Sequence, residues 1–173
     1  MTAAESTVGR TEDHWYPAYV GLGSNLHGPA AQVQSAFELL GELPATRLIA
    51  RSSLYRSAPF GGVEQPDFVN AAAALLTRLS ARQLLTELKR IETRRGRDDN
   101  EVRWGPRVLD LDLLVYGRET VAEAGLVVPH PGIAERNFVL LPLLELAPEL
   151  VVPGVGRLAS LPVNASEPLI EQI

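Results

Sequence analysis

Short apolar runs alternate along the chain with stretches in which apolar residues recur at helical spacing. An apolar run at 18–22 predicts a buried strand that ends in a turn at 23–25. From Pro29 onward, apolar residues recur three to four positions apart and predict a helix that closes near Gly41. Further apolar runs predict strands at 46–55 and 108–116. The alanine-rich run at 68–77 fits a helix or a strand, and we favour a strand.

Two more helices complete the pattern. Ser80 followed by Gln83 forms a capping box, which is typical of a helix start. The apolar residues that share one face of that helix are Leu84, Leu88 and Ile91. A last helix is predicted at 138–146. The resulting order, β-α-β-β-α-β, predicts an α+β fold: a ferredoxin-like sandwich with an antiparallel sheet, helices on one face and a C-terminal helical extension.

Length and composition narrow the class of protein. The 173 residues suit one domain, which we expect at 18–173 after a loose leader at 1–17. The chain has no cysteine, which excludes disulfide frameworks, zinc–thiolate sites and cysteine nucleophiles. No apolar run approaches the roughly 20 residues of a membrane span, so we expect a cytoplasmic protein, and we expect a monomer.

Charge is distributed unevenly. The net charge of −5 argues against a general affinity for nucleic acid or acidic membranes. The stretch 89–107, however, holds seven basic and four acidic residues, a local charge of +3. Fifteen of the 16 basic residues of the chain are arginine, so codon bias and a solvated helix end are one explanation. A local site for a polyanion is the other.

Asp110 and Asp112 are the clearest candidates for chemistry. Both fall within a strongly apolar run, and their alternation with leucines puts them on the same face of the predicted strand. Aspartate is a poor strand former, and two neighbouring like charges repel. A divalent cation would remove that conflict, and Mg²⁺ favours one or two carboxylates plus phosphate oxygens. A solvent-exposed strand face that carries two acids by chance is the alternative.

Arginines lie immediately upstream of this pair. Arg107 precedes Asp110 by three residues, and arginine binds phosphate through a planar fork. A cation site beside arginines is the composition of a polyphosphate clamp. The chain has no P-loop motif, and Gly21-Leu22-Gly23 lacks the further glycines of a dinucleotide fingerprint, so we expect a tight turn there.

Aromatic and polar residues elsewhere suggest a second ligand. Asn70 lies within an apolar strand, where a buried amide needs hydrogen-bond partners. A planar heterocycle between Phe68 and Phe138, with Asn70 at its edge, would account for all three residues. His130 and Arg136 lie in or near a proline-rich turn. Taken alone, each of the five has an ordinary interpretation as a core, turn or surface residue.

The sequence resembles the 6-hydroxymethyl-7,8-dihydropterin pyrophosphokinase family of folate synthesis over roughly residues 18–155. The resemblance rests on six blocks in the same order and at suitable spacing: YVGLGSNL (19–26), SSLYRSAP (52–59), QPDFVNAA (65–72), RWGPRVLDLDLL (103–114), VPHP (128–131) and RNFVLLPLLE (136–145). The resemblance implies an α-β-α sandwich and transfer of the terminal pyrophosphoryl group of ATP to the pterin hydroxymethyl group, with release of AMP.

The resemblance also implies roles for individual residues. Asp110 and Asp112 would bind two Mg²⁺ ions and, with Arg97 and Arg107, form the catalytic set. The residues implied in ATP binding are Glu92, Arg97, Arg107, His130 and Arg136. The residues implied in pterin binding are Ser57, Ala58, Phe60, Gly61, Phe68, Asn70, Trp104 and Phe138. The implied partners are ATP and the hydroxymethyl pterin.

Two other functions stay open on the sequence. A different Mg²⁺-dependent nucleotidyl- or glycosyltransferase would use the D-x-D pair but would not need Phe68, Asn70 and Phe138 together. A regulatory module that binds a small ligand would have little use for two aspartates on a strand next to Arg107.

Overall fold

The computed structural model describes residues 13–59, 62–96, 105–167 and 170–173. Its centre is a six-stranded antiparallel sheet in the order β10-β3-β4-β1-β5, in which β2 also pairs with β4. The strands of this sheet are β1 (Tyr16–Ser24), β2 (Thr46–Arg51), β3 (Tyr55–Ser57), β4 (Phe68–Thr77), β5 (Asp110–Tyr116) and β10 (Ile170–Gln172). The α+β class with an antiparallel sheet is therefore confirmed.

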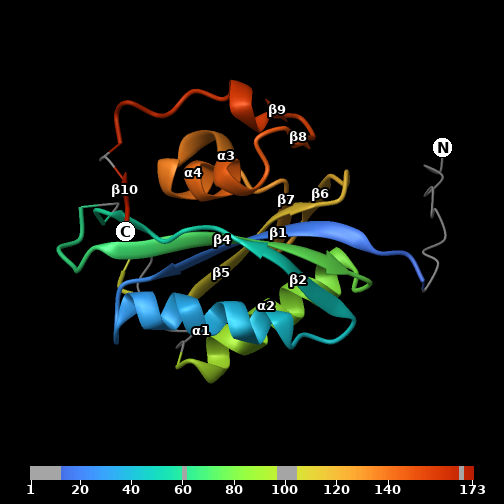
Figure 1. The fold of residues 1–173 in the computed structure, drawn as a ribbon, viewed down its shortest axis with the longest axis horizontal. Coiled ribbons are helices and arrows are strands. Elements are labelled where there is room, and N and C mark those ends of the chain that lie inside the picture. The colour runs from blue at the N-terminus through green and yellow to red at the C-terminus, as the bar shows by residue number, and fades with distance from the viewer. Residues whose placement is uncertain (1–12, 60–61, 97–104, 168–169) are drawn as a thin grey trace.

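Helices cover both faces of the sheet, whereas the motif predicted from the sequence has them on one. α1 (Pro29–Gly41) and α2 (Ala81–Arg94) lie on one face, and α3 (Gly132–Glu135) and α4 (Asn137–Leu146) lie on the other (Figure 1). Each layer has its own apolar cluster. Leu84, Leu88 and Ile91 of α2 belong to the larger one, as their helical spacing predicts. Leu140 and Leu143 of α4 belong to the smaller one, which packs on the other face.

The connections contain elements too short for a sequence pattern to reveal. The hairpin β6 (Val121–Glu123) and β7 (Leu126–Val128) follows β5. After α4 come the hairpin β8 (Val151–Val152) and β9 (Gly156–Arg157), the 3₁₀ turn η1 (Leu158–Ser160) and β10. The predicted C-terminal helical extension is thus only partly helical, because after α4 the chain returns to the sheet as an edge strand.

Three predicted strands have different limits in the structure, and the one expected at 108–116 begins only at Asp110. The strand expected at 46–55 is interrupted after Arg51, and Ser52 bonds Ala72 through its backbone N–H and its hydroxyl, both at 2.8 Å. The first strand begins at Tyr16 instead of Ala18. Just before it, the ring of Trp15 contacts two guanidinium groups, those of Arg47 at 4.7 Å and Arg78 at 5.1 Å from the ring centroid.

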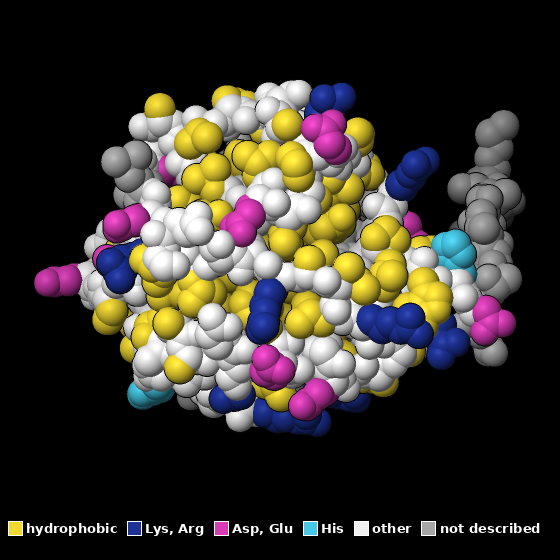
Figure 2. All heavy atoms as spheres, in the orientation of Figure 1, with side chains coloured by type: hydrophobic (Ala, Val, Ile, Leu, Met, Phe, Trp, Pro, Cys, Tyr) yellow, Lys and Arg dark blue, Asp and Glu magenta, His cyan; other side chains and the backbone are white. Residues whose placement is uncertain are grey.

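The surface carries mixed charges. On the face shown in Figure 2, acidic and basic side chains are interspersed over the lower half, where α1 lies, instead of gathering into one basic patch. Within the described part of the chain, no helix is both long enough and apolar enough to cross a bilayer.

Candidate functional site

The register of the central strands brings Asp110, Asp112 and Asn70 onto one face of the sheet. β1 lies between β4 and β5, with Gly23 opposite both Asp110 and Asn70, and Gly21 opposite Asp112. A Cβ at Gly23 would lie 3.4 Å from Asn70 Oδ1. The predicted tight turn at Gly21-Leu22-Gly23 is therefore wrong: both glycines lie within β1, where their lack of side chains leaves an open floor.

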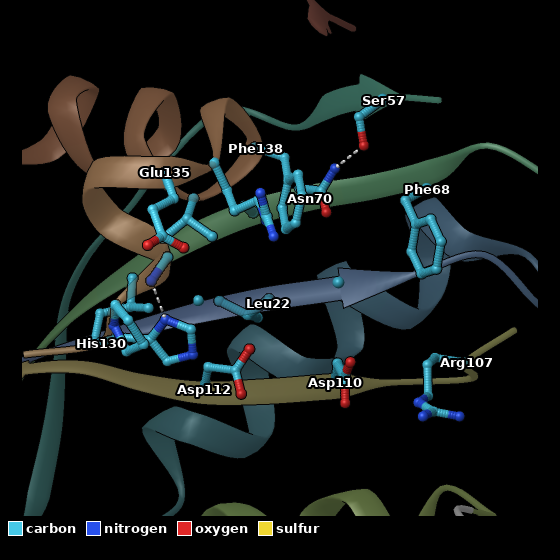
Figure 3. A pocket seen from close by; sticks show the side chains of 18 of the residues that line it. Leu22, Ser57, Phe68, Asn70, Arg107, Asp110, Asp112, His130, Glu135 and Phe138 are labelled. Atoms are coloured by element: carbon cyan, nitrogen blue, oxygen red, sulfur yellow. Dashed lines mark hydrogen bonds between the residues drawn. The ribbon is translucent and has the colours of Figure 1, made fainter. Parts of the chain in front are cut away.

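A cavity of about 520 Å³ lies over this floor, between the sheet and the α3–α4 layer (Figure 3). It brings together most of the residues that the sequence singled out. Those that line it are Ser57, Ala58, Phe68, Asn70, Arg107, Asp110, Asp112, His130, Arg136 and Phe138. Phe60, Gly61, Arg97 and Trp104 lie outside the described residues.

Two aromatic rings and one amide form the upper side of the cavity. Phe68 comes from β4 and Phe138 from α4, and Asn70 lies between them in Figure 3. Asn70 is buried, and its Nδ2 donates to Ser57 Oγ at 2.7 Å. Because this bond fixes the amide, Asn70 can present its remaining donor and acceptor to the edge of a flat heterocycle held by the rings.

The carboxylates of Asp110 and Asp112 form the lower side. Leu109, Leu111 and Leu113 are buried on the opposite face, as the alternation predicts. Among the described residues, no three His, Asp or Glu side chains gather into a metal site. A cation bound here would take two carboxylates from these residues and complete its shell with phosphate and water. This donor set fits Mg²⁺, which prefers hard oxygen ligands and keeps several non-protein ones.

Glu92 does not line the cavity but supports the strand that carries the aspartates. Its side chain has no exposed surface, and its Oε1 accepts from the backbone N–H of Leu111 at 2.7 Å. Lys89 Nζ lies 3.2 Å from the other carboxylate oxygen. β5 is an edge strand of the sheet that the described residues form, so the carboxylate satisfies a backbone donor that none of these strands pairs. Glu92 thus holds the backbone of Leu111, the residue between Asp110 and Asp112.

Asn25 fixes the backbone of Arg107 at the end of the cavity. Arg107 N donates to Asn25 Oδ1 at 2.8 Å, and Asn25 N donates to Arg107 O at 3.0 Å. Asn25 Nδ2 also donates to Gln65 Oε1 and to Pro66 O, each at 2.9 Å. One buried amide therefore joins the loops before β4 and β5. Sequence reasoning passed over Asn25 because its role depends on partners 40 to 82 residues away.

The histidine of the predicted proline-rich turn lies beside Asp112 (Figure 3). His130 N donates to Leu114 O of β5 at 2.8 Å, and Gly132 N donates to His130 Nδ1 at 2.9 Å. Since Nδ1 accepts, the proton of the neutral ring lies on Nε2, which is left as the donor. A Cβ at position 132 would lie 2.9 Å from His130 Nδ1, so any larger residue there would have to displace the imidazole.

Glu135 is a lining residue that sequence reasoning missed. It precedes Arg136 in a short polar stretch whose pattern predicts no element, so no local signal singled it out.

The last turn of α4 is tied to β3 through Glu145. Its carboxylate accepts from Tyr55 OH at 2.5 Å, from Ser53 N at 3.0 Å and from Ser53 Oγ at 2.9 Å. Burial and the hydrogen bond to Glu145, with its negative charge, raise the pKa of Tyr55 to about 12. Burial by itself would raise the pKa of Glu145, but the hydrogen bonds from Tyr55 and Ser53 outweigh it and lower that pKa. This tie holds α4, and hence Phe138, against the sheet.

We expect Glu145→Gln to lower the free energy of unfolding by about 1 kcal/mol at pH 7, the net value of a typical hydrogen bond, because Glu145 is exposed to solvent. Because the pKa of Glu145 is lowered in the folded state, its contribution is present above its ordinary value of 4.5 and is lost as the pH falls through the folded value. Urea unfolding at pH 7 and pH 3.5 checks this, with Glu149→Gln at an exposed pair as the control. An equal difference between wild type and Glu145→Gln at both pH values would contradict it.

Comparison with known proteins identifies the family. The family model described as 7,8-dihydro-6-hydroxymethylpterin-pyrophosphokinase (HPPK) matches residues 19–148. The chain belongs to the HPPK family. The 2-amino-4-hydroxy-6-hydroxymethyldihydropteridine pyrophosphokinase of Pseudomonas aeruginosa is 48% identical over 143 residues, covering 83% of this chain and 88% of the relative. The Haemophilus influenzae protein of that name is 46% identical over 137 residues, 79% of this chain and 85% of the relative.

A solved structure supports the HPPK fold. Wild-type Plasmodium falciparum HPPK-DHPS with pteroate superposes with a TM-score of 0.68 at 15% identity, covering 86% of this chain. This chain spans 42% of that longer protein. The likeness at this identity concerns the fold alone, and it agrees with the α-β-α layers around the cavity.

Proposed function

We propose that this protein transfers the terminal pyrophosphoryl group of ATP to the hydroxyl of 6-hydroxymethyl-7,8-dihydropterin. The products are the pterin diphosphate and AMP, in a step of folate biosynthesis. One observation carries the proposal for this chain: a single cavity joins the ring-binding set Phe68, Asn70 and Phe138 to the carboxylates Asp110 and Asp112. A transfer between a flat heterocycle and a polyphosphate requires such a pair of subsites side by side.

The reaction needs positioning and charge stabilisation more than covalent help. The hydroxyl oxygen of the pterin forms a bond to the β-phosphorus of ATP, and the bond from that phosphorus to the oxygen bridging to the α-phosphate breaks. The hydroxyl loses its proton, and AMP leaves with the bridging oxygen. Phe68 and Phe138 would hold the ring, and Asn70 would fix its orientation through the polar edge.

Basic side chains would hold the nucleotide. Arg107 follows Asp112 and Asp110 along one side of the cavity in Figure 3, and it would clamp phosphate oxygens through its guanidinium fork. His130 Nε2 and Arg136 would contact ATP from the α3–α4 side. Glu92 would act indirectly, by holding the backbone of Leu111 between the two aspartates. Ser57 and Ala58 would line the pterin subsite. The same proposal extends to residues outside the described ranges: Arg97 in the phosphate clamp, and Phe60, Gly61 and Trp104 around the pterin.

Asp110 and Asp112 would hold two Mg²⁺ ions. Bound there with ATP, the ions would neutralise phosphate charge and lower the pKa of the attacking hydroxyl. The two carboxylates would fix where the triphosphate lies relative to the ring-binding set. Arg107 would add positive charge from the chain itself on the same side of the cavity.

We further propose that the fold is a ferredoxin-like sandwich, since the order of β2 and β3, β4, β1 and β5 around α1 and α2 fits that topology. We propose a single domain, whose first strand already includes residues 16 and 17 of the leader expected at 1–17. We also propose a monomer acting in the cytoplasm, where ATP is available, without nucleic-acid or membrane partners.

Identification of the nucleotide product tests the function. The protein is mixed with ATP, Mg²⁺ and 6-hydroxymethyl-7,8-dihydropterin, and the nucleotides are separated by anion-exchange chromatography. We expect AMP in equal amount to the pterin diphosphate. ADP as the product would refute pyrophosphoryl transfer and indicate an ordinary kinase.

We expect Arg107→Ala to lower kcat by about a hundredfold, because it removes a positive group from the phosphate side of the site. Its backbone contacts with Asn25 do not depend on the side chain, so the loop stays in place. Single-turnover kinetics measure the effect, and Arg118→Ala, on a turn after β5, serves as the control. Unchanged kinetics in Arg107→Ala would argue against a phosphate role.

A further inference from the structure

The C-terminal segment contacts the wall of the cavity that carries Arg136 and Phe138. Residues 149–173 lie outside the range that the family model matches, 19–148. In Figure 1 the segment runs above α3 and α4 before it reaches the sheet as β10. The junction of α3 and α4, at Arg136, is therefore covered by a part of the chain that comes about 30 residues later.

Asn164 holds the residues on either side of Arg136. Asn137 Nδ2 donates to Asn164 O at 2.8 Å, and Asn164 N donates to Asn137 Oδ1 at 2.8 Å. Asn164 Nδ2 donates to Glu135 O at 3.2 Å. Asn137 is buried, so this reciprocal pair satisfies an amide that water does not reach. The backbone around Arg136 is thus fixed by the C-terminal segment.

Glu167 binds Arg136 itself and the start of α4. Its Oε1 lies 3.4 Å from Arg136 Nη1, and its Oε2 accepts from Asn137 N at 2.7 Å. The Glu167 side chain is only 8% exposed and that of Arg136 is 24% exposed, so solvent screens the pair weakly. No side chain at the N-cap position of α4 caps the helix, and the Glu167 carboxylate supplies an acceptor and a negative charge at its N-terminus.

We propose that Glu167 is a positioning residue that holds the Arg136 guanidinium oriented at the nucleotide end of the cavity. The inference rests on the proposed role of Arg136 in ATP binding. Arginine has many rotamers, and a side chain fixed before the ligand arrives does not lose that freedom on binding. The second oxygen of the same carboxylate binds the first turn of α4. One carboxylate therefore fixes the position of the Arg136 side chain relative to the helix that carries Phe138.

The test is a double-mutant cycle between Glu167→Gln and Arg136→Ala. Glutamine keeps the size of the side chain and an acceptor for Asn137 N, but it loses the charge that orients Arg136. We expect Glu167→Gln to raise the KM for ATP about five- to tenfold, the cost of ordering one long side chain, and to change the Kd for the pterin by less than about twofold. Glu171→Gln is the matched control: Glu171 of β10 forms an exposed pair with Arg56 of β3, and its replacement should change neither quantity.

The cycle separates positioning from a merely structural role. We expect Arg136→Ala to raise the KM for ATP at least as much, and Glu167→Gln to add nothing in the Arg136→Ala background. An unchanged KM in Glu167→Gln, or an equal rise in both backgrounds, would overturn the proposal while wild type still forms AMP. Failure of the proposed function itself looks different: the wild type would form no AMP, and both proposals would fall.

Discussion

Removal of either aspartate of the pair should abolish turnover while leaving pterin binding intact. We expect Asp110→Ala and Asp112→Ala each to lower kcat about a thousandfold, because a loss of about 4 kcal/mol of charge stabilisation corresponds to that factor. Phe68, Asn70 and Phe138 lie on the other side of the cavity, so the Kd for the pterin should stay within about twofold of wild type. Steady-state kinetics and isothermal titration with the pterin measure the two effects.

Asp110→Asn and Asp112→Asn sharpen this experiment because they keep the shape of each side chain. Both should lose activity nearly as fully, since a neutral amide binds Mg²⁺ far more weakly than a carboxylate does. Glu149→Gln, at an exposed pair with Arg157, controls for the loss of a negative charge in general. Near-normal rates with Mg²⁺ in both asparagine variants would show that the carboxylates do not hold the ions.

Replacement of Glu92 should destabilise the whole fold as well as impair the site. Glu92→Ala leaves the buried N–H of Leu111 without its acceptor and removes a buried side chain. We expect the free energy of unfolding to fall by about 3 kcal/mol, the cost of an unsatisfied backbone donor together with lost packing. Because Leu111 lies between the two aspartates, we also expect kcat to fall. Urea unfolding and steady-state kinetics measure the two changes.

Glu87→Ala provides the matched control on the same helix. Glu87 pairs with Arg90 three residues away, at 2.5 Å, with the arginine largely exposed. Such a pair contributes about 0.5 kcal/mol or less, so this variant should unfold close to wild type. Equal stability of Glu92→Ala and Glu87→Ala would contradict the role of Glu92 as the acceptor for the edge of β5.

Local patterns were sufficient to predict the elements whose apolar and polar residues recur with a regular period, or whose ends carry a short motif. The period-two alternation of leucine and aspartate placed Asp110 and Asp112 on one face of β5, and the capping box at Ser80 marked the start of α2. Features that depend on cross-strand contact were missed. Gly21 and Gly23 resemble a turn in the sequence, but opposite Asp112 and Asp110 they form the floor of a cavity.

By itself, the sequence determined the α+β class, the aspartate pair and the family, because strand alternation, helical spacing and short motifs are local along the chain. Only the tertiary structure decided what holds these residues in place. Asn25, Glu92 and Glu167 reach partners 82, 19 and 31 residues away, and nothing near each of them in the chain announces that contact. A hydrogen bond across such a separation exists only after the sheet and its two helical layers have formed, so its partners cannot be read from spacing.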